Sequence, residues 1–226
     1  MFFAALCVAC GRPGERLCAP CAGRLEPARP FDPPPELDAC VALLAYDGTA
    51  RDLIVALKYR NGRWLAQRSG TALGVLVGDE VGSGSPGASR PIDLVTWAPT
   101  GRRRRRARGY DQAELVARQV GRALHLPTRR LLERQAGAPQ TGRSRAERLS
   151  GPSFSPTRAG CRAGGAAILV VDDVLTTGAT LSAAARALRP FAPRWVGGAV
   201  LAHTELGSGR SPAARPGPPV RDDHAA

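Results

Sequence analysis

The sequence predicts an α/β protein, with helices flanking a mainly parallel sheet and a small zinc-ribbon-like module in front. From residue 40 onward, short apolar runs alternate with helical patterns, which is typical of a parallel sheet covered by helices. Two C-x2-C pairs lie within the first 21 residues. A chain of 226 residues, 43% hydrophobic, allows one substantial domain plus a small module and excludes wholesale disorder.

The N-terminal cysteines are spaced C-x2-C-x7-C-x2-C, which offers four thiolates for a tetrahedral Zn²⁺. In a reducing compartment a disulfide is the weaker option, and a redox pair or unused thiols remain the alternatives. Residues 1–26 hold little apolar sequence of their own, so we expect this module to need its metal to fold. The expected metal ligands are Cys7, Cys10, Cys18 and Cys21.

Three further regions follow the cysteines. Residues 27–39 are rich in proline and predict a semi-rigid linker, which neither a helix nor a sheet would accept. Residues 40–206 form the main domain. Residues 207–226 contain Gly, Pro, Ser and Arg with almost no apolar side chains, and this composition predicts a disordered tail.

Within the main domain the period of the apolar residues distinguishes strands from helices. Asp111 begins the best-marked helix, with Glu114 three residues later in a capping-box arrangement. The predicted strands are 40–46, 92–98, 128–132, 166–172 and 195–202. The predicted helices are 49–59, 64–77, 111–125 and 179–189.

A long segment, about residues 134–160, separates the third and fourth predicted strands and has no convincing periodicity. Loops of this length in compact domains are usually binding loops, lids or disorder. Several arginines, spaced by Gly, Ser and Pro, are compatible with a mobile polar flap over an anionic site. A disordered insertion is the equal alternative.

The most specific segment is the apolar run 168–171, followed by Asp172 and Asp173 and then by T-T-G-A-T at 176–180. The free N–H groups at the start of a helix, together with its dipole, bind phosphate, and Gly178 lets the backbone come close. Adjacent carboxylates suit a vicinal diol or a hydrated Mg²⁺. These groups together describe a ribose 5-phosphate. The plainer alternative is a capped helix beside solvated acids, and the combination of features argues against it.

Other classes of protein are excluded or disfavoured by what the sequence lacks. It has no G-x-x-x-x-G-K-[ST], which excludes a P-loop NTPase, and no G-x-G-x-x-G after a strand, which disfavours a dinucleotide site. No apolar run approaches the roughly 20 residues that cross a bilayer. Residues 1–6 lack the basic flank of a signal peptide. We therefore expect a cytoplasmic protein.

The formal net charge of +13 favours an anionic ligand, although the Ala-, Gly- and Arg-rich composition accounts for part of it. Lys58 is the only lysine, so almost all basic side chains are arginines. Arginines at 102–106 and 108 form a run that is either solvated or binds phosphate. If the run binds phosphate groups, these belong to pyrophosphate, to single-stranded DNA or to both. Aromatic residues make up only 5%, so a base-stacking platform is not indicated.

The motif V-V-D-D-V-L-T-T-G-A-T resembles the phosphoribosyl diphosphate (PRPP) signature of type I phosphoribosyltransferases. Over residues 4–204 the chain resembles the ComF family of competence-associated, phosphoribosyltransferase-like proteins. The matching features are, in order, the two C-x2-C pairs, L-K-Y-R at 57–60, R-R-A-R-G-Y-D-Q at 105–112, Gln140, Glu147 with Arg148, and the Asp-Asp loop.

This resemblance implies a type I phosphoribosyltransferase fold in which the 134–160 segment is a hood over the reaction. It implies Asp172, Asp173 and Arg148 as catalytic residues, and Mg²⁺ as the ion that accompanies PRPP. The implied PRPP-binding residues are Asp172, Asp173, Thr176, Thr177, Gly178, Ala179 and Thr180. The implied pyrophosphate-binding residues are Pro99, Thr100, Gly101 and Arg102, and the implied hood and anion-binding residues are Arg106, Arg108, Gln140 and Arg145.

Two functions follow as expectations. The first is Mg²⁺-dependent transfer of a 5-phosphoribosyl group from PRPP to an unknown acceptor. The second is a non-enzymatic protein that binds PRPP, a nucleotide or single-stranded DNA and assists the DNA-uptake machinery in competence and transformation.

Overall fold

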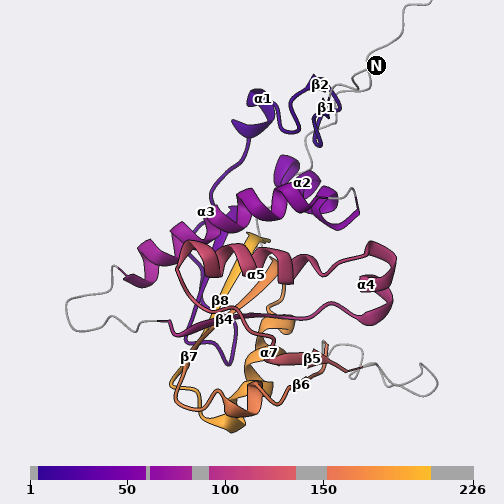
Figure 1. The fold of residues 1–226 in the computed structure, drawn as a ribbon. Helices are drawn as coiled ribbons and strands as arrows, with labels where there is room; N and C mark the ends of the chain where they lie inside the picture. The colour runs from indigo at the N-terminus through magenta and orange to yellow at the C-terminus, as the bar shows by residue number, and fades with distance from the viewer. Residues whose placement is uncertain (1–4, 60–61, 83–91, 136–151, 205–226) are drawn as a thin grey trace, which may run out of the picture.

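A computed structural model describes residues 5–59, 62–82, 92–135 and 152–204 (Figure 1). At its centre lies a parallel sheet with the strand order β3-β8-β7-β4. The strands are β3 (Ala39–Ala45), β4 (Leu94–Trp97), β7 (Ala167–Leu175) and β8 (Trp195–His203). Each lies on a predicted strand, so the mainly parallel α/β architecture is confirmed.

Helices cover both faces of this sheet (Figure 1). One face packs against α2 (Gly48–Tyr59), α3 (Arg63–Gly82) and α5 (Gln112–Ala123), and the other against α7 (Ala179–Leu188). The four predicted helices are confirmed, and α3 continues beyond the predicted residue 77. Short 3-10 turns occur at Gly160–Arg162 and Arg189–Phe191.

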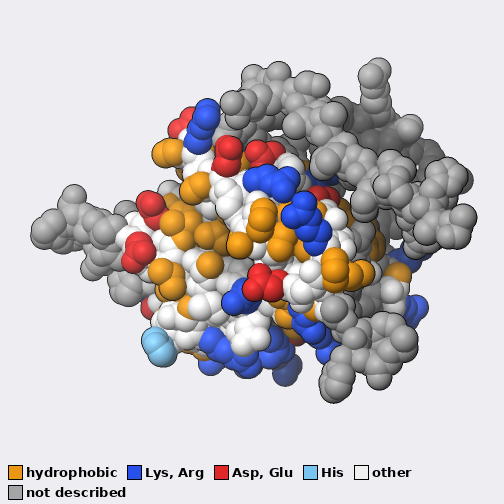
Figure 2. Space-filling view, turned by 90° about the horizontal axis from the view of Figure 1, so that it is seen from above, with side chains coloured by type: hydrophobic (Ala, Val, Ile, Leu, Met, Phe, Trp, Pro, Cys, Tyr) orange, Lys and Arg blue, Asp and Glu red, His pale blue; other side chains and the backbone are white. Residues whose placement is uncertain are grey.

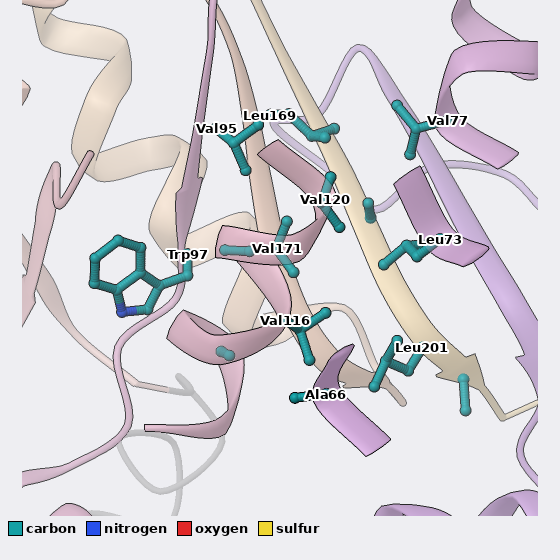
Figure 3. Packing of buried hydrophobic residues seen from close by; sticks show 14 of the residues in the cluster. Ala66, Leu73, Val77, Val95, Trp97, Val116, Val120, Leu169, Val171 and Leu201 are labelled. Carbon is teal, nitrogen blue, oxygen red and sulfur yellow. The ribbon is translucent and has the colours of Figure 1, made fainter. Parts of the chain in front are cut away.

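The core explains why the central strand is apolar throughout. Side chains alternate across a strand, so Leu169 and Val171 of β7 face α3 and α5, while Ile168 and Val170 face α7. Burial on both faces is the reason for the uninterrupted apolar run. Figure 3 shows the first of these two layers, to which the helices contribute Ala66, Leu73, Val77, Val116 and Val120.

The predicted strand 128–132 is wrong. This segment runs beside β4 but forms only one bridge to it, between Thr128 and Val95. The ladder ends because the Leu131 N–H donates to the Thr96 hydroxyl instead of to a backbone carbonyl (3.3 Å). The chain then forms β5 (Leu132–Arg134), which pairs antiparallel with β6 (Phe154–Pro156) in a separate small sheet.

Residues 27–39, predicted as a linker, contact the main domain along their length. Pro27 bridges to Leu44 at the edge of β3, where a missing N–H is tolerated. Asp38 exchanges two hydrogen bonds with Val196 of β8 through its N–H and its carboxylate. Leu37 is buried in the core under α7. These contacts hold the intervening prolines close to the start of α7.

The N-terminal module consists of β1 (Ala5–Leu6), β2 (Pro13–Gly14) and the short helix α1 (Ala19–Ala22). It lies beyond α2 and α3 (Figure 1). Val8 packs against the core, and the Arg16 guanidinium lies 5.7 Å from the Trp64 ring centroid. None of the helices in the described ranges combines the length and apolar character that a membrane crossing requires.

Candidate functional site

The strand order itself points to a binding crevice. After β4 the chain passes to α5 on one face of the sheet, and after the neighbouring β7 it passes to α7 on the other. In parallel sheets, ligands bind outside the carboxyl ends of strands where the connections diverge in this way. A cavity of about 260 Å³ lies at this point, and both Pro99 and Thr180 line it.

The loop after β7 has the form expected of a phosphate-binding loop. Gly178 precedes α7 with a φ of 74°, and the first N–H groups of a helix have no partner within the helix, so they are available to an anion. Thr176 and Thr180 line the cavity, and the Thr177 hydroxyl accepts from the Ala179 N–H (3.4 Å). A recess of about 20 Å³ lies within the same loop.

Gly178 is required for a second reason besides its positive φ. A Cβ added there would lie 2.6 Å from the Pro34 Cβ and 2.8 Å from its Cγ. Pro34 therefore closes one side of the loop between β7 and α7. The proline-rich segment contributes to the shape of the site, which sequence reasoning did not predict.

Gly178→Ala should destabilise the protein by more than Gly165→Ala, its matched control. Both glycines have φ near +70°, but an added Cβ at Gly165 meets nothing within 4 Å. Positive φ at a non-glycine residue costs about 1–3 kcal/mol in either variant, and the clash with Pro34 adds to it. Urea unfolding measures the difference. Equal losses in the two variants would contradict the close contact with Pro34.

The predicted strand 166–172 ended at Asp172, but β7 continues to Leu175, so both acids lie within the strand. Asp173 is 7% exposed; its Oδ1 lies 3.1 Å from Lys58 Nζ, and its Oδ2 accepts from Gln112 Nε2 (2.7 Å). Asp172 lines the cavity, and its Oδ1 accepts from the Asp173 N–H (2.8 Å). Burial and the charge of Asp173 raise the pKa of Asp172 well above its usual value.

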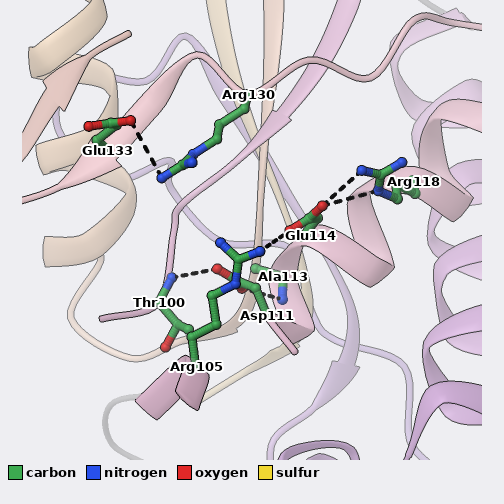
Figure 4. Close-up of polar contacts among 8 residues, drawn as sticks. All are labelled: Thr100, Arg105, Asp111, Ala113, Glu114, Arg118, Arg130 and Glu133. Carbon is green, nitrogen blue, oxygen red and sulfur yellow. Dashed lines mark hydrogen bonds and ion pairs between the residues drawn. The ribbon is translucent and has the colours of Figure 1, made fainter. Parts of the chain in front are cut away.

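The turn after β4 is fixed by Asp111, as Figure 4 shows. Asp111 Oδ2 accepts from the Thr100 N–H (2.9 Å), while Oδ1 accepts from the Ala113 N–H (3.2 Å), so one carboxylate caps α5 and holds the turn. Burial raises the pKa of Asp111. The Glu114 carboxylate pairs with Arg118 (2.8 Å) and approaches Arg105 (4.0 Å). Pro99 and Thr100 line the cavity, whereas Gly101 and Arg102 begin a helix.

The arginine run folds as that helix, α4 (Arg102–Arg108), which the sequence did not predict. Like charges three and four residues apart destabilise an isolated helix, so tertiary contacts must support it. Arg104 and Arg108 line the cavity. Arg106 is exposed on the same helix. Exposed arginines such as Arg118 and Arg186 lie outside the cavity, and blue side chains gather along the lower edge of Figure 2, so positive charge alone does not locate the site.

Arg134 of β5 also lines the cavity; the sequence placed it at the start of the polar segment 134–160 but did not single it out as a site residue. Its guanidinium is half-buried, and burial together with the charge of Arg104 lowers its pKa. Within the described ranges neither arginine forms an ion pair with an acid. Two cations that converge in this way favour an anion between them.

Other predicted residues lie outside the described ranges. These are Gln140, Arg145, Arg148 and most of the expected hood. Sequence reasoning also missed the roles of Tyr46, Lys58 and Gln112 as lining residues. Two signals pointed to Lys58 and Gln112 in advance: both lie in motifs that match the ComF resemblance, and Lys58 is the single lysine of an arginine-rich chain.

The four N-terminal cysteines form one cluster whose sulfur atoms all lie within 4.8 Å of one another. The Sγ atoms of Cys10 and Cys18 are 3.6 Å apart, close to the separation of about 3.8 Å in a tetrahedral zinc–thiolate site. Burial raises the pKa of Cys7, but the N–H groups of Cys10, Cys18 and Ala9 lower it by more, to about 6. Burial and the neighbouring thiols raise the pKa of Cys21 to about 12. The donor set fits Zn²⁺.

Residues 113–217 match the family model described as the phosphoribosyl transferase domain. The matched segment includes α5, β7, the loop at 172–180, α7 and β8. It therefore contains the side of the crevice that carries the two acids and the loop after β7, and it supports the phosphoribosyltransferase fold predicted from the sequence. No curated protein matches this chain.

Several solved structures are similar to this chain. One is described as the allosteric regulatory enzyme of purine biosynthesis (19% identity, 65% of this chain, 30% of that chain, TM-score 0.42). Another is glutamine PRPP amidotransferase from B. subtilis complexed with ADP and GMP (19% identity, 65% of this chain, 30% of that chain, TM-score 0.43). A third is purine phosphoribosyltransferase from Pyrococcus horikoshii (16% identity, 63% of this chain, 78% of that chain, TM-score 0.37). The chain spans about 30% of the length of the first two.

Proposed function

We propose that this chain binds PRPP with Mg²⁺ and transfers its 5-phosphoribosyl group to an acceptor, releasing pyrophosphate. One observation carries this proposal: a single cavity is lined by the loop after β7, two adjacent carboxylates and three arginines, Arg104, Arg108 and Arg134, for which the described ranges show no acidic partner. A phosphate, a diol and a diphosphate are the three parts of PRPP that these groups would bind.

Each group has a distinct role in the proposed reaction. The N–H groups at the start of α7 and the Thr176 and Thr180 hydroxyls bind the 5-phosphate. Asp172 accepts hydrogen bonds from the ribose hydroxyls, which orients C1 toward the acceptor. Mg²⁺, when bound, neutralises charge on the departing diphosphate. Arg104 and Arg134 stabilise the negative charge that grows on the leaving group as C1 becomes oxocarbenium-like.

Arg134→Met should weaken PRPP binding by about tenfold or more, because a charge-assisted hydrogen bond contributes about 1.5–3 kcal/mol. Binding of ribose 5-phosphate should change far less, because that ligand lacks the diphosphate. Isothermal calorimetry with both ligands measures the contrast. Arg118→Met is the matched control, since Arg118 is exposed and pairs with Glu114 outside the cavity. Equal losses for both ligands would contradict the diphosphate role.

The proposed activity is tested by pyrophosphate release from PRPP across a panel of bases, amines and carboxylate acceptors. Micromolar PRPP binding in the presence of Mg²⁺, with release stimulated by one acceptor class, is the expected result. PRPP binding without release by any acceptor would reject the transferase and leave a binding protein. Intact folded protein that gives no binding signal would reject both.

A second candidate is a non-enzymatic accessory protein of DNA uptake, as the ComF resemblance implies. The observation that favours it is α4, which has no buried residue and exposes five consecutive arginines to solvent. Fluorescence anisotropy with single-stranded DNA should give an affinity that falls steeply with salt. Changing Arg102, Arg103 and Arg106 to Ala should reduce that slope. A flat response to salt, or an unchanged slope, would remove this candidate.

The N-terminal cysteine cluster is proposed as a structural zinc site with the ligands Cys7, Cys10, Cys18 and Cys21. Four thiolates without an open coordination position are typical of structural zinc and not of catalytic zinc. The contacts of this module with α3 support a role in folding, and a cytoplasmic location fits its dependence on reduced thiols.

A further inference from the structure

Lys58, at the end of α2, is the cation that meets the acidic pair. Its ammonium nitrogen lies 3.1 Å from Asp173 Oδ1, and its side chain is 23% exposed. The other carboxylate oxygen, Oδ2, accepts from Gln112 Nε2 at 2.7 Å. Both oxygens of Asp173 are thus occupied by protein groups. Asp172, by contrast, accepts one backbone hydrogen bond and lines the cavity beside it.

Gln112 is itself held in place. Its Oε1 accepts from Arg108 Nη1 (2.7 Å), and Arg108 Nη2 donates to the Tyr59 hydroxyl (3.1 Å). The Arg108 guanidinium also lies 4.8 Å from the Tyr59 ring centroid. Tyr59 follows Lys58 directly, so this chain of contacts starts and ends at the last turn of α2. The network connects α2, α4, α5 and β7 around Asp173.

The identity of the cation is informative. Apart from three histidines, every other basic side chain in this sequence is arginine, yet a lysine stands here. An ammonium is a compact point charge that fits against one carboxylate oxygen, whereas a guanidinium is a planar fork that seeks both oxygens. Because Gln112 already donates to the second oxygen, the position suits lysine and not arginine.

We propose that Lys58 is a positioning residue that neutralises and holds Asp173, so that Asp172 is the acid that meets the ligand's hydroxyl groups. This inference rests on the proposed function, since the ligand is a phosphorylated sugar. Without the ammonium, two adjacent carboxylates would repel each other, and the nearly buried Asp173 would lack a counter-charge. Asp172 would then move or take up a proton, and its hydroxyl-binding geometry would be lost.

A double-mutant cycle tests the inference on the ligand. Lys58→Met and Asp173→Asn should each lower PRPP affinity by about tenfold or more. A loss of this size is within the range of interaction energies measured between residues in contact. The double variant should bind PRPP better than either single variant, because neither charge is then left unpaired. Lys58→Arg should restore only part of the affinity. Arg51→Met, an exposed cation on the same helix, is the matched control and should bind like wild type.

The same cycle in the free protein separates this inference from the proposed function. Urea unfolding without ligand should show that the double variant loses less stability than the two single losses summed. If the losses caused by Lys58→Met and Asp173→Asn simply add in the double variant, in stability or in affinity, the proposed pairing of Lys58 with Asp173 is overturned. If wild type does not bind PRPP, the proposed function fails and this inference falls with it. If wild type binds PRPP but Lys58→Met binds it equally well, only this inference is overturned.

Discussion

Asp172→Asn is expected to reduce PRPP affinity by about 10- to 100-fold while making the free protein more stable. The affinity falls because an amide oxygen is a weaker acceptor for the ribose hydroxyls than a carboxylate, and a charged hydrogen bond contributes about 1.5–3 kcal/mol. The variant should keep its fold, since the Asn oxygen can still accept from the Asp173 N–H. Calorimetry in the presence of Mg²⁺ measures the loss.

The gain in stability follows from the raised pKa of Asp172, which burial and the charge of Asp173 produce. Consider a carboxyl group whose pKa is higher in the folded chain than in the unfolded chain. Its contribution to stability is fully present at pH values below the unfolded-state pKa, and it is lost as the pH rises through the folded-state pKa. Asparagine carries no such charge. The Tm of the variant should therefore exceed that of wild type, and the gap should widen from acidic to mildly alkaline pH.

Asp93→Asn is the control of opposite sign. The Ala167 N–H and the Arg194 guanidinium lower the pKa of Asp93. Its ionised form therefore stabilises the fold at pH values above the unfolded-state pKa, and this stabilisation is lost as the pH falls through the folded-state pKa. Replacing it should lower the Tm near neutral pH and leave PRPP binding unchanged. An Asp172→Asn variant that binds PRPP like wild type, or that loses stability as Asp93→Asn does, would contradict the assigned role.

Cys21→Ser is expected to abolish zinc binding and to unfold the N-terminal module. Structural zinc supplies about 10–16 kcal/mol of apparent folding free energy in small modules at neutral pH, and three remaining thiolates cannot close the tetrahedron. The main domain should stay folded, because its two core clusters consist almost entirely of residues outside the module. Elemental analysis for zinc and circular dichroism measure the two effects separately.

Cys161→Ser is the matched control, since this thiol is exposed and lies in the 3-10 turn at Gly160–Arg162. It should retain one zinc per chain and the wild-type spectrum. Wild-type protein purified without chelator that contains no zinc, or equal zinc loss in both variants, would refute the metal site. Loss of the entire fold in Cys21→Ser would show instead that the module supports the main domain.

Much of this protein was predictable from the sequence because the relevant physics is local. The alternation of β3, the helices and β7 follows from hydrophobic period, and α5 begins at a residue whose side chain caps it. The groups of the loop after β7 are only a few residues apart in the chain, and the four cysteines lie within fifteen residues, in two C-x2-C pairs. Because both sets of groups are close in sequence, their spacing was enough to predict that each set would cluster.

The tertiary structure alone decided which distant residues complete the site. Lys58, Gln112 and Arg134 come from different elements, and only the strand order β3-β8-β7-β4 brings them to Asp172 and Asp173. Segment 128–132 was predicted to be a strand, yet the Thr96 hydroxyl accepts the Leu131 N–H and the pairing with β4 ends there. The physical reason is common to both cases: a hydrogen-bond or charge partner is chosen by proximity in space, and hydrophobic periodicity along the chain does not encode that proximity.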